Sequence, residues 1–358
     1  MNIKKSPNAI VVGMALFSMF FGSGNLIFPL MLGRDAGNLF YLSAISFILS
    51  AVIIPFLGVL AIIKAQGNYR LIFEGFLGKK LSFIMIFFSL VCFIPLGAGP
   101  RCVILAHASL KQFISMPPLW LFSLLFLIFI AYLVSDKRHI LDVLGKVLTP
   151  ALLICVITMV IASLSYGQLG EPLQTPMDIG LNSLFEGYNT QDLFSALFFS
   201  STLLSLINHS FDNKKQLRAT LFKAGILGCL MLMLLYVLLI LASAYHSSIL
   251  LGESGIKLVS ILAKHTLGQA GLIASLAVAL ACLTTAVALV LAFKDFFINS
   301  FACSNNKALF LSVASIFATS LIKFEGITAI ISPILKFFYP IVLLLVCAFL
   351  LAPSKINK

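Results

Sequence analysis

The stretch Phe17–Leu32, FSMFFGSGNLIFPLML, decides how the rest of the chain is interpreted. Both of its ends are apolar enough for a membrane helix, but the GSGN segment between them (residues 22–25) contains poor helix formers. Pro29 lacks an N–H group and clashes with the carbonyl group of Asn25. These local effects predict a helix break. Within a membrane, breaks face protein or a water-filled cavity and bind substrates and ions in secondary transporters. The alternative is a glycine-rich packing face.

The composition predicts an integral membrane protein. Of the 358 residues, 61% are hydrophobic and 10% are charged, whereas soluble domains are about 45–50% apolar and about 25% charged. Apolar runs of about 20 residues without alternation exclude a β-barrel. The net charge of +12 is dispersed over short loops, so no nucleic-acid partner is expected. The seven cysteines contain no CxxC pair and predict neither a disulfide framework nor a metal cluster.

The apolar runs predict ten membrane helices, each long enough for a hydrocarbon layer of about 30 Å. When the loops are assigned alternately to the two sides, 17 of the 24 Lys and Arg residues lie on the side of both termini. The positive-inside rule therefore places the N- and C-termini in the cytoplasm. The predicted spans are residues 8–32, 40–64, 81–107, 117–135, 145–167, 191–208, 221–245, 269–297, 308–323 and 327–352.

The polar stretch 168–190 divides these spans into five and five, and it is interpreted as an external linker. Because five is odd, the two halves, about 8–167 and 191–352, run in opposite directions through the membrane and predict an inverted repeat within a single transporter domain, 1–358. The sixth span should then be broken like the first. Its polar cluster at residues 200–202 is the expected place, and the alternative is hydroxyl groups bonded back to carbonyls of an intact helix.

Ala281, Thr284 and Thr285 share one face of the eighth span. Their oxygens are the hard donors that a small cation such as Na⁺ requires, although threonine pairs also occur as packing residues. Arg101 lies inside the third span and is either functional or bonded to the carbonyls of a kink. Lys146, near Asp142, is either a snorkelling side chain or a proton-coupling group.

Two absences narrow the function further. Asp and Glu are missing from the central part of every predicted span, which argues against a carboxylate proton relay. The motifs HExxH, GxSxG and the Walker loop are also missing, so an enzyme is not expected.

Three stretches carry a resemblance to a known family. FFGSGNLIFPLMLG at residues 20–33 is similar to the signature of the bacterial branched-chain amino acid carriers, the LIVCS or system II symporters. GPR at 99–101 and ACLTTAVAL at 281–289 resemble two further stretches of that family. Members usually carry two more C-terminal helices, so the resemblance covers the ten-helix core. It implies a LeuT-type fold with an inverted repeat and broken first and sixth helices.

The resemblance also implies a function and a set of site residues. Expected are Na⁺-coupled symport of leucine, isoleucine and valine in the bacterial inner membrane, with contact to lipid and no cofactor besides the coupling ion. Proton coupling in the same fold, or a passive channel or scaffold, are the alternatives. Phe20 and Phe199 would line an apolar pocket for the side chain. The implied substrate contacts are Gly22, Ser23, Gly24, Asn25, Phe199, Ser200 and Ser201, and the implied Na⁺ ligands are Ser18, Phe21, Ala281, Thr284 and Thr285.

Overall fold

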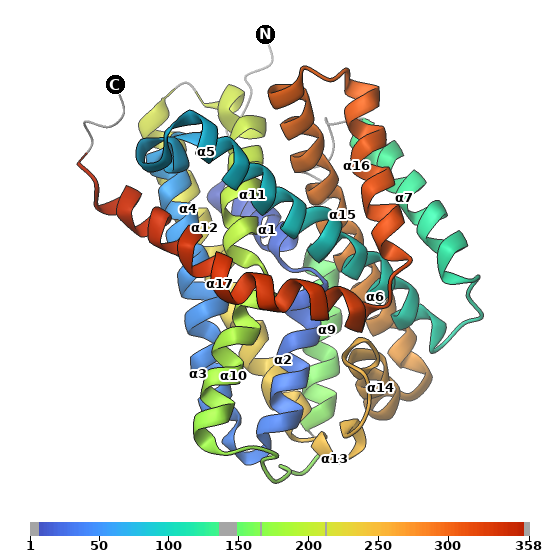
Figure 1. Cartoon of the computed structure of the whole chain (residues 1–358). Coiled ribbons are helices and arrows are strands. Elements are labelled where there is room, and N and C mark those ends of the chain that lie inside the picture. Colours follow the sequence, from blue (N-terminus) through green and yellow to red (C-terminus); the bar gives the residue numbers. More distant parts are fainter. Residues whose placement is uncertain (1–6, 136–148, 165–166, 212, 354–358) are drawn as a thin grey trace.

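The computed structural model describes residues 7–135, 149–164, 167–211 and 213–353. Within these ranges the chain is helical and contains no strand, which confirms the prediction of an all-α protein (Figure 1). Lys146 and Asp142 lie outside the described residues. The prediction of a membrane protein is also supported, because the described part contains helical segments long and apolar enough to cross a bilayer. Six such segments occur there, at Ser23–Lys64, Arg70–Lys111, Pro176–Ser210, Lys214–Ala244, Gly255–Phe301 and Phe324–Leu351.

The break predicted in the first span is confirmed. Helix α1 (Ala9–Phe20) stops before the GSGN segment, and α2 (Ser23–Ala36) begins within it. Gly22 between them is extended, with φ −112° and ψ −157°. Pro29 lies inside α2 and does not end it. The break therefore depends on the poor helix formers at residues 22–25, and not on the proline.

A second helix break exists, but it lies at residues 190–191, at the start of the predicted sixth span and before its hydroxyl cluster. Helix α10 (Pro176–Asn189) ends before Thr190 and Gln191, and α11 (Asp192–Ile207) continues without interruption through residues 200–202. There the Thr202 hydroxyl group donates back to the carbonyl oxygen of Phe198 at 3.0 Å, as in an intact helix. The prediction of a break at 200–202 was therefore wrong, and so was the reading of 168–190 as a linker throughout, since residues 176–189 are helical.

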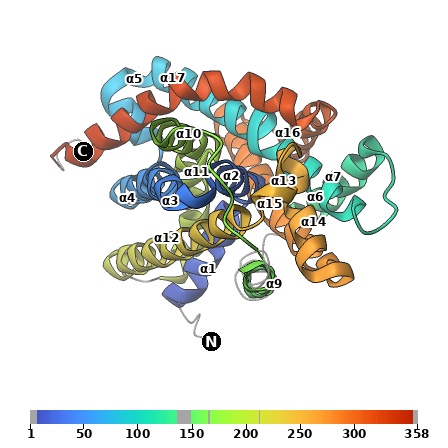
Figure 2. The ribbon, with the colours of Figure 1, turned by 90° about the horizontal axis from the view of Figure 1, so that it is seen from below.

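The remaining elements surround these two broken helices. Figure 2 shows α2 near the centre of the molecule, and it packs against α3, α10, α12 and α14. Helix α1 packs against α11, α12 and α15, while α17 crosses the outside of α5 and α10. The other α-helices are α3 (Phe40–Ile48), α4 (Ile54–Lys64), α5 (Arg70–Phe93), α6 (Gly99–Lys111), α7 (Leu119–Ser135), α9 (Thr149–Leu164), α12 (Lys214–Ala244), α13 (Ser247–Leu250), α14 (Gly255–Leu267), α15 (Gly271–Phe301), α16 (Asn305–Ser320) and α17 (Phe324–Leu351).

Two of the long helices contain π-helical turns. Leu49–Ile53 joins α3 to α4, and Ile94–Ala98 joins α5 to α6. Such turns leave backbone carbonyls without their usual helical partners and occur frequently at functional sites. The second of them lies just before Arg101, and it is used at the site described below.

Candidate functional site

Oxygen atoms from α1 and α15 gather beside the first break. The Thr284 hydroxyl group lies 3.2 Å from the carbonyl oxygen of Ser18 and 2.8 Å from that of Ala281. The Thr285 hydroxyl group lies 3.4 Å from the carbonyl oxygen of Ser18 and 3.2 Å from that of Met19. All these side chains are buried. Because the last carbonyls of a helix carry a partial negative charge, these hard oxygen atoms suit a small cation.

This cluster contains four of the five residues proposed as Na⁺ ligands. Ser18, Ala281, Thr284 and Thr285 lie together, and the further α1 carbonyl in contact with Thr285 is that of Met19, which the sequence analysis did not name. Phe21, the fifth residue, follows the last residue of α1 and stacks its ring on Phe17 at 5.2 Å. The local spacing thus predicted the threonine face correctly.

Gly22 allows α15 to approach the break closely. A Cβ atom at Gly22 would lie 2.9 Å from Cγ2 of Thr285. A Cβ atom at Gly24 would lie 3.3 Å from the Cα atom of Thr190 in the second break. The two glycines therefore bring the first break against both the threonine pair and the second break, which a sequence motif alone does not reveal.

Asn25 connects the two breaks through its side chain. Its Oδ1 accepts a hydrogen bond from the N–H group of Gly22 at 3.2 Å, within the first break. Its Nδ2 donates to Oδ2 of Asp192, the first residue of α11, at 2.7 Å, and also contacts the hydroxyl group of Tyr236 on α12. The Tyr236 hydroxyl group donates to the same Asp192 oxygen at 3.0 Å. All three side chains are buried, so they form one closed polar group.

Asp192 is a functional candidate that sequence reasoning missed. It is fully buried beside both breaks, in the middle of the apolar segment Pro176–Ser210, whereas the sequence analysis found no Asp or Glu in the central part of a predicted span. It was missed because the sixth span was drawn from residue 191, which placed Asp192 at a span end. The structure shows instead that α10 precedes it within the same segment, Pro176–Ser210. The Asp directly before the apolar run of α11 was the available signal.

Arg101 holds the second break in place. Its guanidinium group donates to the carbonyl oxygens of Gly97 and Asn189 at 3.1 and 2.9 Å, and to Oε1 of Gln191 at 2.6 Å. Gln191 itself has a left-handed conformation (φ 65°), and its Nε2 donates to the carbonyl oxygen of Cys92 at 3.2 Å. Of the two interpretations of Arg101, the one that bonds it to backbone carbonyls is confirmed.

The residues proposed on α11 do not all lie at the breaks. The ring of Phe199 lies 6.4 Å from that of Phe20, the last residue of α1, and 5.4 Å from that of Phe93. The three rings form an apolar cluster next to the first break. Ser201 instead donates to the carbonyl oxygen of Gly67 in the turn between α4 and α5. The hydroxyl group of Ser200 is buried and has no hydrogen-bond partner within the described ranges.

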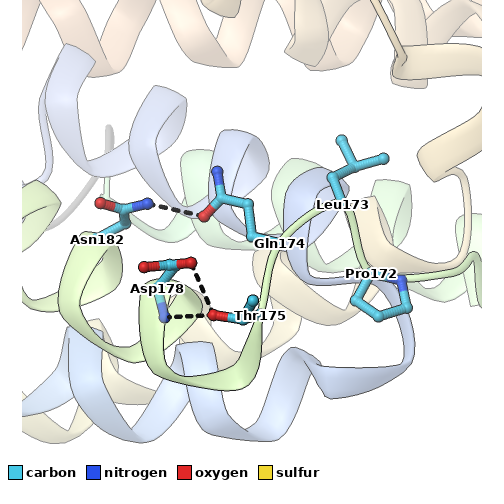
Figure 3. Close-up of a pocket in the computed structure, with 6 residues that line it drawn as sticks. All are labelled: Pro172, Leu173, Gln174, Thr175, Asp178 and Asn182. Atoms are coloured by element: carbon cyan, nitrogen blue, oxygen red, sulfur yellow. Dashed lines mark hydrogen bonds between the residues drawn. The ribbon is translucent and has the colours of Figure 1, made fainter.

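The connection before α10 carries surface hollows. It lies at the end of the molecule opposite the α4–α5 turn (Figure 1). In the hollow drawn in Figure 3, Thr175 and Asp178 cap the start of α10, and Asn182 donates to Gln174 at 2.7 Å. Thr175 and Asp178 in this hollow are therefore explained as capping residues of α10. A neighbouring crevice of about 220 Å³ extends between α2 and α10 as far as Glu186, one turn before the second break.

The comparisons agree with this geometry. A family model described as branched-chain amino acid transport protein matches residues 5–357. The branched-chain amino acid permease BrnQ of Corynebacterium glutamicum is 31% identical over 365 residues, covering 98% of this chain and 82% of the permease.

Two solved transporters show the fold. One is MhsT in complex with L-phenylalanine, with a TM-score of 0.64, 18% identity, and coverage of 94% of this chain and 88% of MhsT. The other is Mhp1, a nucleobase-cation-symport-1 family transporter in a closed conformation with bromovinylhydantoin bound, with a TM-score of 0.66, 14% identity, and coverage of 97% and 79%. The predicted LeuT-type fold is thereby confirmed. From the extent of the family match and of the permease similarity, this chain belongs to the family of branched-chain amino acid transport proteins, which are membrane transporters and not enzymes.

Proposed function

We propose that the chain imports leucine, isoleucine and valine by Na⁺-coupled symport with alternating access. The observation that carries the proposal is the meeting of two broken helices at one buried place, with an oxygen cluster for a cation beside the first break. A carboxylate, an ammonium group and a cation each find a complementary set of atoms there. The name of the C. glutamicum permease supports the substrate class.

The start of α2 is suited to the carboxylate group of the substrate. The first N–H groups of a helix have no partner within the helix, and they carry a partial positive charge. At α2 these groups belong to Ser23, Gly24 and Asn25, while the N–H of Gly22 is already bonded to the Asn25 side chain. Helix starts of this kind bind carboxylates and phosphates without any basic side chain.

The apolar cluster is suited to the aliphatic side chain. Phe20, Phe93 and Phe199 are buried, and the ring of Phe199 packs against the other two next to the first break. One methylene group in such a pocket changes the binding free energy by about 1–3 kcal/mol, so the three branched-chain substrates should overlap in affinity.

Na⁺ would bind to the carbonyl oxygens of Ser18, Met19 and Ala281 and the hydroxyl oxygens of Thr284 and Thr285. The hydroxyl groups now donate to these carbonyls, and they would turn their lone pairs toward the ion. The second candidate function is proton-coupled amino acid transport in the same fold, which the buried carboxylate of Asp192 favours.

Uptake of radiolabelled leucine into proteoliposomes tests the proposal, with the Na⁺ gradient and the pH gradient set separately. We expect saturable uptake that requires inward-directed Na⁺ and that excess isoleucine and valine inhibit. Uptake driven by the pH gradient alone would show that H⁺, and not Na⁺, is the coupling ion. Leucine flux that follows only its own gradient and does not saturate would identify a passive channel.

A further inference from the structure

The two oxygen atoms of Asp192 differ in their surroundings. Nδ2 of Asn25 and the hydroxyl group of Tyr236 both donate to Oδ2. Oδ1 is fully buried and has no hydrogen-bond partner among the described residues. A buried carboxylate oxygen without a donor costs more than any other unsatisfied acceptor, and so such an atom in a membrane protein points to a ligand.

We propose that Oδ1 of Asp192 binds the ammonium group of the transported amino acid. The inference rests on the proposed function, because it assigns a residue to the substrate within that site. Asp192 is bonded to Asn25, whose backbone N–H belongs to the first turn of α2. The side chain of Asn25 thus connects the start of α2, where the substrate carboxylate is proposed to bind, with the side chain of Asp192. An α-amino acid, whose two charged groups share one carbon atom, fits such a pair of neighbouring sites.

Three carbonyl oxygens beside the second break, which could also receive an ammonium group, already accept hydrogen bonds. The carbonyl oxygen of Gly187 accepts from the hydroxyl group of Thr190 at 2.8 Å, and that of Tyr188 accepts from the N–H of Gln191 at 3.0 Å. The carbonyl oxygen of Asn189 accepts from Arg101 at 2.9 Å. Oδ1 of Asp192, which has no hydrogen-bond partner among the described residues, is therefore a stronger candidate for the ammonium group than these three carbonyl oxygens.

Burial disfavours a negative charge at Asp192, so the charge depends on nearby groups that stabilise it. Arg101 directs its guanidinium bonds to Gly97, Asn189 and Gln191. The start of α11 and the donors Asn25 and Tyr236 stabilise a negative charge at Asp192. An ammonium group at Oδ1 would form a charge-assisted hydrogen bond in a site that excludes water, where such bonds are strongest.

The test compares leucine with leucate, the analogue that carries a hydroxyl group in place of the ammonium group. Calorimetric titration of the detergent-solubilised full chain gives the affinity for each. We expect Asp192→Asn to weaken leucine binding about 100-fold or more, because the ammonium group loses its charged partner, while leucate binding changes less than about tenfold. Asp192→Glu keeps the charge and should retain a preference for leucine over leucate.

Two control variants separate this effect from misfolding. Glu325→Gln removes an exposed carboxylate from the first turn of α17 and should leave both affinities unchanged. Tyr236→Phe removes a donor to Oδ2 but keeps Oδ1, so it should preserve the ratio of leucine to leucate affinity. If Asp192→Asn does not fold, Asp192→Glu decides the assignment: a retained preference for leucine over leucate supports it, and equal affinities for leucine and leucate contradict it.

The outcomes also separate this inference from the proposed function. If the wild type binds and transports leucine but Asp192→Asn keeps leucine affinity within threefold, the inference is overturned and the function stands. If Asp192→Asn weakens leucine and leucate equally and raises the Na⁺ requirement, or removes a pH dependence, Asp192 binds the coupling ion instead. If the wild type neither binds nor transports leucine, the proposed function itself fails.

Discussion

The side-chain amide of Asn25 donates a hydrogen bond of 2.7 Å to Oδ2 of Asp192, so the two helix breaks are joined directly across 167 residues of sequence. The same amide group accepts from the N–H of Gly22 and thereby orders the first break. A single side chain therefore contacts both breaks. In a transporter whose two halves move relative to each other, we expect this hydrogen bond in the conformations that bring the two breaks together.

Asn25→Ala should reduce leucine uptake by at least about 30-fold while the protein still inserts into the membrane. The substitution removes three buried hydrogen bonds, one of them to a carboxylate, at a cost of about 2–4 kcal/mol. Initial rates in proteoliposomes measure the effect. Asn182→Ala on exposed α10, which loses only a bond to Gln174, is the matched control and should transport normally. Uptake by Asn25→Ala within twofold of wild type would leave the Asn25 bridge without a function.

Thr284→Ala should raise the Na⁺ concentration for half-maximal uptake about tenfold, because the cation loses one hydroxyl ligand. Thr284→Ser keeps the hydroxyl group and should be milder. Leucine affinity at saturating Na⁺ should change less, although by linkage leucine should also promote Na⁺ binding less well. Thr319→Ala on α16, whose hydroxyl group bonds only within its own helix, is the control. Equal damage from Ser and Ala at residue 284 would identify a packing residue.

Gly22→Ala should raise the Na⁺ requirement about fivefold or more, since its Cβ atom would press on Cγ2 of Thr285 at 2.9 Å and displace a cation ligand. Adding Thr285→Ser removes that methyl group, so the double variant should recover part of the loss. Gly180→Ala, whose Cβ atom would meet only Ser46 at 3.6 Å, should behave as wild type. Strictly additive effects of the Gly22 and Thr285 substitutions would show that the contact does not matter.

Arg101→Met should lower the midpoint of thermal unfolding in detergent by about 5 °C or more. It leaves the carbonyl oxygens of Gly97 and Asn189 and Oε1 of Gln191 buried without this donor. Arg101→Lys should rescue only part of the loss, because an ammonium group cannot match the planar fork. Arg218→Met, at an exposed position on α12, is the control. An unchanged midpoint for Arg101→Met would mean that the second break holds without Arg101.

Single cysteines on a background free of cysteine should report the orientation. With both termini in the cytoplasm, Leu173→Cys before α10 should react with a membrane-impermeant maleimide added to intact cells. Lys215→Cys at the start of α12 should react only after permeabilisation. Both positions are exposed, so access to the thiol group is comparable. Labelling of both from the same side would overturn the ten-span topology.

The sequence by itself determined the features that depend on neighbouring residues. The GSGN segment breaks the first helix because its own residues are poor helix formers, and the spacing of Ala281, Thr284 and Thr285 places them on one face of any helix. The composition was enough to predict a membrane protein, and three short stretches were enough to predict the family. None of these features needs information from another part of the chain.

The tertiary structure decided the second break and the residues that depend on it. Residues 190–192 contain no glycine or proline, and Gln191 adopts a left-handed conformation because Arg101, 90 residues earlier, binds its side chain and the end of α10. Asp192 is buried because Asn25 and Tyr236 donate to it from two other helices. Local propensity favours an uninterrupted helix through the hydroxyl cluster. A left-handed backbone at a residue with a side chain costs free energy, and here contacts distant in the sequence offset that cost.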